Sequence, residues 1–95
     1  MNITLHLRIA GRVQGVGYRY ALGAEAQAGG INGWVRNRRD GTVEAVVQGE
    51  PQAVEKIVAW AKRGPPAARV TQVDVQAAQG NFDRPYARFE ELPTT

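Results

Sequence analysis

A glycine-punctuated segment near the N-terminus contains the residues with the clearest chemical potential. It runs Gly11-Arg12-Val13-Gln14-Gly15-Val16-Gly17-Tyr18-Arg19 and joins an alternating stretch to a helical one. The first turn of a helix has unpaired N–H groups and partial positive charge, so an arginine there is unfavourable unless an anion is bound nearby. Taken alone, the loop could be an ordinary glycine-rich connection. The loop and Arg19 together predict a binding site for phosphate or carboxylate.

The hydrophobic pattern predicts the elements that position this loop. Alternation of Ile3, Leu5, Leu7 and Ile9 indicates a strand before it, and residues 18–28 form an alanine-rich helix that stops at Gly29-Gly30. The later elements are a strand over 31–38, a hairpin turn at Asp40-Gly41, a strand over 42–48, a helix from Pro51 to Lys62-Arg63, a strand through Val73, Val75 and Ala77, a polar loop over 79–85 and a short edge strand over 86–91.

This order, β-α-β-β-α-β, predicts the α+β class and a single domain over residues 1–95. We expect a ferredoxin-like open-faced sandwich, an antiparallel sheet with two helices on one face. Its first two strands run parallel with the third between them, so their carboxyl ends lie about 10 Å apart at one edge. Asn37, at the end of the second strand, can therefore reach the same ligand as Arg19.

Composition narrows the classes of function. The 95 residues include 12 basic and nine acidic ones, a net charge of +3, which suits a small anionic ligand better than nucleic acid. The chain has no cysteine, which excludes a disulfide or a cysteine nucleophile, and it contains no serine. No metal-ligand spacing is present, so we expect neither metal nor cofactor. The alternating N-terminus argues against a signal peptide or membrane span, and we expect a cytoplasmic protein.

Two segments resemble the signatures of the acylphosphatase family. They are Gly11 to Arg19 and Gly33-Trp34-Val35-Arg36-Asn37, the latter followed by Gly41, Val43 and Gly49; Gly64-Pro65-Pro66-Ala67 with Arg69-Val70 also recurs in the family. The resemblance covers essentially the whole chain. Three features depart from the family pattern: Tyr18 where many members have Phe, Gly17 where some have a bulkier residue, and the tail after Phe89.

The resemblance implies hydrolysis of acyl phosphates to a carboxylate and inorganic phosphate by direct attack of water. It implies that Arg19 holds the phosphate and that Asn37 orients the water. The loop N–H groups that wrap the phosphoryl oxygens would be those of Arg12, Val13, Gln14, Gly15, Val16, Gly17 and Tyr18. The expected partners are a small acyl phosphate and inorganic phosphate, the latter as product and competitive inhibitor, with no nucleic acid, no membrane and a monomeric chain.

Two alternatives remain. One is an accessory domain that binds acyl or carbamoyl phosphates without turning them over. The other, more distant, is an RNA-binding ferredoxin-like module, which would need aromatic side chains on the open face of the central strands. The pattern assigns that face polar residues such as His6, Arg8 and Glu44. We assign His6 to a surface or sheet-packing role, Trp34 and Trp60 to packing, and Arg36, Arg38 and Arg39 to a solvated face.

Overall fold

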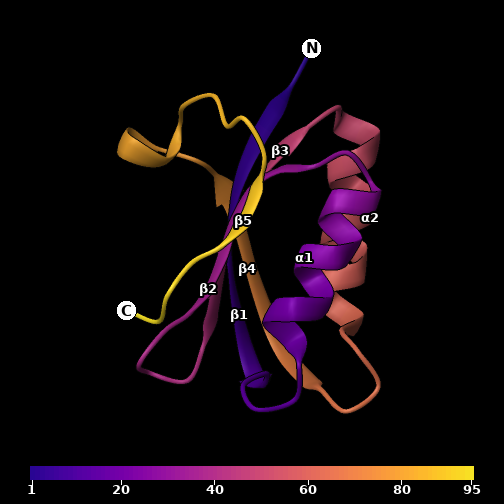
Figure 1. Cartoon of the computed structure of the whole chain (residues 1–95), viewed down its shortest axis with the longest axis vertical. Coiled ribbons are helices and arrows are strands. Elements are labelled where there is room, and N and C mark those ends of the chain that lie inside the picture. Colours follow the sequence, from indigo (N-terminus) through magenta and orange to yellow (C-terminus); the bar gives the residue numbers. More distant parts are fainter.

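A computed structural model describes all residues from Met1 to Thr95. One five-stranded sheet, ordered β4-β1-β3-β2-β5, is covered on one face by two helices (Figure 1). The elements are β1 (Ile3–Arg12), α1 (Tyr18–Ala28), β2 (Asn32–Asn37), β3 (Val43–Gly49), α2 (Pro51–Arg63), β4 (Arg69–Ala77), the short 3₁₀ helix η1 (Gly80–Phe82) and β5 (Phe89–Glu91). The ferredoxin-like arrangement of β1 to β4 and both helices is confirmed.

The edge strand β5 makes the sheet mixed rather than wholly antiparallel, because it pairs with β2 in parallel. The reason is the direction of β4, which is antiparallel to β1 and hence to β2. A chain that turns back after β4 must then approach β2 running the same way. The strand covers Phe89–Glu91, half of the predicted 86–91.

Two other strands are longer than the hydrophobic pattern predicts. β1 continues through Gly11 to Arg12, and β4 starts at Arg69, because these segments pair with each other beyond a register shift between Ala10 and Gly11. Side-chain alternation fails at such a shift, although the backbone pairing continues. The predicted loop therefore loses its first two residues to the sheet.

The core lies between the sheet and the helices. Leu7 and Ile9 of β1 are fully buried there. They belong to one cluster with Leu22 and Ala26 of α1 and with Val54, Ile57 and Ala61 of α2. Their spacing, two on the strand and three or four on the helices, accounts for the elements that formed. The packed layer fixes the start of α1 relative to the ends of β1 and β2.

Tyr18, the first residue of α1, anchors that helix to the end of α2. Its ring is 1% exposed, and its hydroxyl donates a 2.7 Å hydrogen bond to the carbonyl oxygen of Ala61. That carbonyl has no helical donor, because the residue four positions on is Pro65, which lacks an N–H. Burial raises the pKa of the Tyr18 phenol well above its ordinary value, so the hydroxyl keeps its proton at neutral pH.

A buried carboxylate organises the open face of the sheet. Glu44 on β3 has a side chain that is only 3% exposed, and it accepts bonds from Arg36 Nε at 2.8 Å and Arg38 Nη1 at 3.1 Å. His6 Nε2 lies 2.6 Å from its other oxygen. The expectation of a solvated arginine run is therefore wrong for Arg36 and Arg38. It holds for Arg39, which is exposed.

Burial alone would raise the pKa of the Glu44 carboxyl. Hydrogen bonds from His6 and Arg36, together with their positive charge, outweigh this and hold the pKa below its ordinary value of 4.5. A carboxyl with a lowered folded-state pKa stabilises the fold fully above its unfolded pKa and loses that contribution as the pH falls through the folded value.

We expect Glu44→Gln to lower the free energy of unfolding at neutral pH by about 2 kcal/mol, since it leaves the surrounding guanidinium groups without their counter-charge. The deficit should shrink as the pH falls below about 4.5, the ordinary pKa of the carboxyl, because the wild-type protein then loses the stabilisation that its lowered folded-state pKa provides. Urea denaturation at about pH 7 and pH 3.5 measures both values. Glu55→Gln, at an exposed position of α2, is the control. A deficit that stayed constant with pH would contradict this assignment.

We expect Tyr18→Phe to lower the free energy of unfolding by about 1–2 kcal/mol, because it leaves the buried Ala61 carbonyl unpaired. Chemical denaturation of the two proteins measures the difference. Equal stability would mean that the Ala61 oxygen finds another donor.

Candidate functional site

The loop between β1 and α1 lies at the lower end of the molecule, near the hairpin that joins β2 to β3 (Figure 1). Gly15 and Gly17 have positive φ angles of 75° and 78°, a left-handed backbone that glycine adopts without the strain of a side chain. Gly17 also precedes the first residue of α1. The N–H groups from Gln14 to Tyr20 donate to no backbone acceptor. They form a run of free donors at a helix N-terminus, where an anion is favoured.

A hollow of about 230 Å³ lies against this loop. Its lining comprises Val13, Gln14, Gly15, Gly17, Tyr18, Arg19, Tyr20, Asn37 and Glu91. Arg12, which was predicted for the loop, is the last residue of β1 and pairs with Arg69. The Val16 side chain packs against the core, while its N–H belongs to the run of free donors. Arg19 and Asn37, from different elements, line the same hollow because β1 and β2 are parallel and end at one edge.

Asn37 has an unmatched polar atom. Its Oδ1 is buried and has no hydrogen-bond partner. A buried oxygen left without a donor costs about 1–3 kcal/mol, so native structures rarely contain one unless a water or ligand occupies the position. The atom belongs to a residue that lines the same hollow as the loop donors. The arrangement can hold an anion on one side and a hydrogen-bond donor such as water on the other.

The side chain of Gln14 links the loop to the strand that bears Asn37. Its Nε2 donates to the carbonyl oxygens of Arg38 at 2.7 Å and Thr42 at 2.8 Å. These two carbonyls flank the β2–β3 turn, one residue beyond Asn37 and one before Val43. The sequence predicts a role only for the backbone N–H of Gln14. The side-chain role could not be found there, because the pairing depends on how the loop meets the hairpin.

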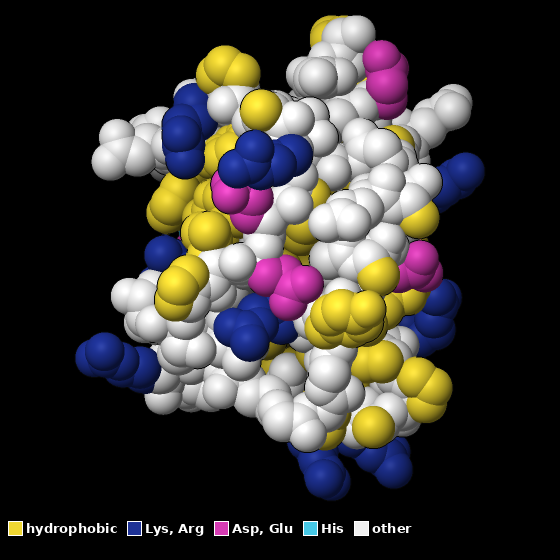
Figure 2. Space-filling view, viewed as in Figure 1, with side chains coloured by type: hydrophobic (Ala, Val, Ile, Leu, Met, Phe, Trp, Pro, Cys, Tyr) yellow, Lys and Arg dark blue, Asp and Glu magenta, His cyan; other side chains and the backbone are white.

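The C-terminal segment contacts Arg19. Nη1 of Arg19 donates to the carbonyl oxygen of Leu92 at 3.3 Å, and its Nε lies 3.9 Å from a carboxylate oxygen of Glu91. Figure 2 shows basic and acidic side chains side by side in the region between β5 and α1. The Arg19 side chain is 35% exposed, so these contacts orient it without enclosing it. Sequence reasoning missed Glu91 and Leu92, since no local pattern indicates that the tail returns to the loop.

No group of three or more His, Cys, Asp or Glu side chains is placed to hold a metal ion. None of the helices has both the length and the apolar character needed to cross a lipid bilayer.

Comparisons with known proteins agree with this geometry. The family model described as Acylphosphatase matches residues 5–90. The acylphosphatase of Thermococcus kodakarensis is 57% identical over 75 residues, which is 79% of this chain and 82% of that protein. The acylphosphatase structure from Bacillus subtilis is 35% identical with a TM-score of 0.86, covering 97% of this chain and 99% of that one. The Coxiella burnetii acylphosphatase is 30% identical with a TM-score of 0.88, covering 96% and 93%. With this family model, these relatives and this fold, the chain belongs to the acylphosphatase family.

Proposed function

We propose that this acylphosphatase-family chain hydrolyses acyl phosphates by direct attack of one water molecule on phosphorus. The loop N–H groups bind the phosphoryl oxygens, Arg19 neutralises their charge, and Asn37 Oδ1 accepts a hydrogen bond from the attacking water. The observation that carries the proposal is the unpartnered Asn37 oxygen in the hollow that Arg19 also lines. It is the position at which a water would be needed.

These residue types suffice for the reaction. The leaving group of an acyl phosphate is a carboxylate, which departs without being protonated, so no general acid is required. Catalysis of phosphoryl transfer consists mainly of positioning and charge stabilisation. A planar guanidinium can contact two phosphoryl oxygens at once, which an ammonium group cannot do in the same geometry. The neutral amide of Asn37 does not remove a proton from water, but it can hold the molecule in line with the scissile bond.

Arg19 is oriented by the C-terminal segment. The Leu92 carbonyl oxygen accepts a hydrogen bond from Nη1 of Arg19, and the Glu91 carboxylate lies near Nε of the same side chain. The remaining guanidinium N–H groups are then free to face a phosphate. We propose Glu91 and Leu92 as positioning residues for Arg19.

We further propose that the reaction needs no metal or cofactor and that the chain acts as a monomer in the cytoplasm. The lack of a metal-binding cluster supports the metal-free reaction, and the cysteine-free composition suits a reducing compartment. Hydrolysis of acetyl phosphate in the presence of a chelator tests the metal-free reaction, and inorganic phosphate should inhibit it competitively. Phosphate binding with no turnover would favour the non-catalytic alternative instead.

We expect Arg19→Ala and Asn37→Ala to affect kcat and phosphate binding in different ways. Loss of the guanidinium should reduce kcat/KM for acetyl phosphate by about 10³-fold or more and weaken phosphate binding, because the transition-state charge is no longer neutralised. Loss of the amide should reduce kcat by about 10²-fold while the affinity for phosphate stays within about twofold, since only the water loses its partner. Steady-state kinetics and calorimetric phosphate titration separate the two effects.

Lys62→Ala, which removes an exposed positive charge of α2 from outside the hollow, is the control for lost positive charge and should leave turnover unchanged. Full turnover by Asn37→Ala would contradict the proposal that Asn37 orients the attacking water.

We expect Gln14→Ala to weaken phosphate binding by about tenfold and to lower kcat as well. The two hydrogen bonds that hold the loop against the Asn37 hairpin are lost, and each contributes about 1 kcal/mol. Calorimetry with inorganic phosphate measures the first effect, and Gln27→Ala at an exposed position of α1 serves as control. An unchanged phosphate affinity would show that the loop holds its shape without this side chain.

A further inference from the structure

Tyr20 is an exposed aromatic residue at the mouth of the anion hollow. Its side chain is 72% exposed, whereas most large apolar side chains of this chain are buried. It follows Arg19 in the first turn of α1 and lines the same hollow. An exposed aromatic ring beside a binding site is a common means of contacting an apolar part of a ligand.

The same ring also lines a second hollow of about 900 Å³. Tyr20 is the residue that the two hollows share. The second hollow lies between α1 and the segment after α2, and its lining is largely apolar: Ala21, Ala24, Ala28, Trp60, Pro65, Pro66 and Ala68 accompany Tyr20. Two charged residues, Glu25 and Arg63, also line it. An apolar surface therefore starts where the anion hollow ends.

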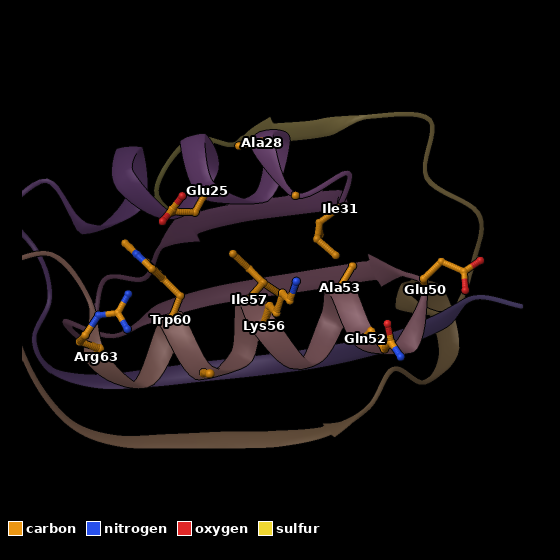
Figure 3. Close-up of a pocket in the computed structure, with 12 residues that line it drawn as sticks. Glu25, Ala28, Ile31, Glu50, Gln52, Ala53, Lys56, Ile57, Trp60 and Arg63 are labelled. Carbon is orange, nitrogen blue, oxygen red and sulfur yellow. The ribbon is translucent and has the colours of Figure 1, made fainter.

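This surface continues between the two helices. Glu25, Ala28, Trp60 and Arg63 also line a groove of about 660 Å³, whose other residues include Ile31, Ala53 and Ile57. Figure 3 shows Trp60 and Ile57 on α2 and Glu25 on α1 around this groove, with Glu50 and Gln52 at its opposite end. The three hollows thus form a path along the helical layer from the loop, in which each hollow shares lining residues with the next.

Resting on the proposed function, we propose that this path binds the acyl group of the substrate and that Tyr20 makes the chain prefer apolar acyl groups. An acyl phosphate has a charged phosphoryl end and a carboxyl end that bears the variable group. With the phosphoryl end held by the loop and Arg19, the variable group must leave the hollow. Tyr20 and the alanines beyond it are the apolar surface next to that exit, and their contact removes apolar area of the group from water.

The charges along the path agree with an apolar occupant. The charged residues that line the second hollow are Glu25 and Arg63, one of each sign, and both also line the inter-helix groove. The second hollow therefore has no net charge that would favour a charged acyl group. A short aliphatic chain or an aryl ring suits this part of the path.

The experiment compares kcat/KM for hexanoyl phosphate with kcat/KM for acetyl phosphate, so that each protein is its own reference. The wild-type ratio should be about ten or more, since each methylene against an apolar surface adds to transition-state binding. Tyr20→Ala should reduce the ratio to about two, mainly through a higher KM for hexanoyl phosphate. Tyr20→Phe should keep the wild-type ratio, because the ring and not the hydroxyl makes the contact. Ala24→Glu should lower it by placing a carboxylate on the path.

Two controls separate this inference from the proposed function. Arg19→Ala should lower both rates by a similar factor and preserve the ratio, because it acts on the phosphoryl end. Val75 is, like Tyr20, an exposed apolar residue, but it lies on β4 and lines none of the three hollows, so Val75→Ala should change neither rate. A wild-type ratio near one, or a ratio unaffected by both Tyr20→Ala and Ala24→Glu, overturns the inference while hydrolysis of acetyl phosphate still supports the function. Absence of hydrolysis with either substrate overturns both.

Discussion

Backbone N–H groups from Gln14 to Tyr20 and the Oδ1 of Asn37 have no protein partner, and polar groups in that condition cost free energy unless a ligand or water completes them. The rest of the structure can be understood as the means by which the chain keeps these groups unpaired and close together. Strand β3 lies between β1 and β2 and so sets the distance between the loop that follows β1 and Asn37 at the end of β2. A loop that relaxed would pair its own donors, so the site depends on the rigidity of what surrounds it.

Three sets of side-chain hydrogen bonds, from different parts of the chain, supply that rigidity. Gln14 joins the loop to the hairpin through two carbonyls, and Tyr18 joins the start of α1 to the end of α2. On the opposite face of the sheet, Glu44 binds Arg36 and Arg38, the two neighbours of Asn37. Because side chains alternate along a strand, fixing these arginines on the open face fixes Asn37 toward the other one. A carboxylate that takes no part in the reaction thereby controls the direction of the amide.

The sequence could predict whatever depends on local signals. Both helices begin and end at the predicted residues, because Gly17 and Gly29 bound α1 while Pro51 and Gly64 bound α2. Strand order predicts that Arg19 and Asn37 lie at one edge of the sheet, and both line one hollow there, although the role assigned to Asn37 rests mostly on the resemblance to acylphosphatases. The extension of β1 to Arg12, the parallel direction of β5 and the contact of Leu92 with Arg19 could not be predicted in the same way. Each depends on where a distant segment returns, and neither periodicity nor capping contains that information. The burial of Glu44 could not be predicted for a related reason. The hydrophobic pattern places Glu44 on the open face of the sheet, but it does not show that three arginines and a histidine surround the carboxylate there.

Recognition by backbone donors also limits what the loop can distinguish. N–H groups and a guanidinium respond to the charge and tetrahedral shape of a phosphoryl group, which every acyl phosphate shares. Discrimination between acyl groups must therefore come from side chains outside the cradle, and it can only come from those that a substrate meets on leaving it. Asn37 of β2 and Glu91 of β5 also line the hollow. Tyr20 is the lining residue that this hollow shares with the one beside α1, so on the proposed path selection of the acyl group takes place on α1 and on the segment that follows α2.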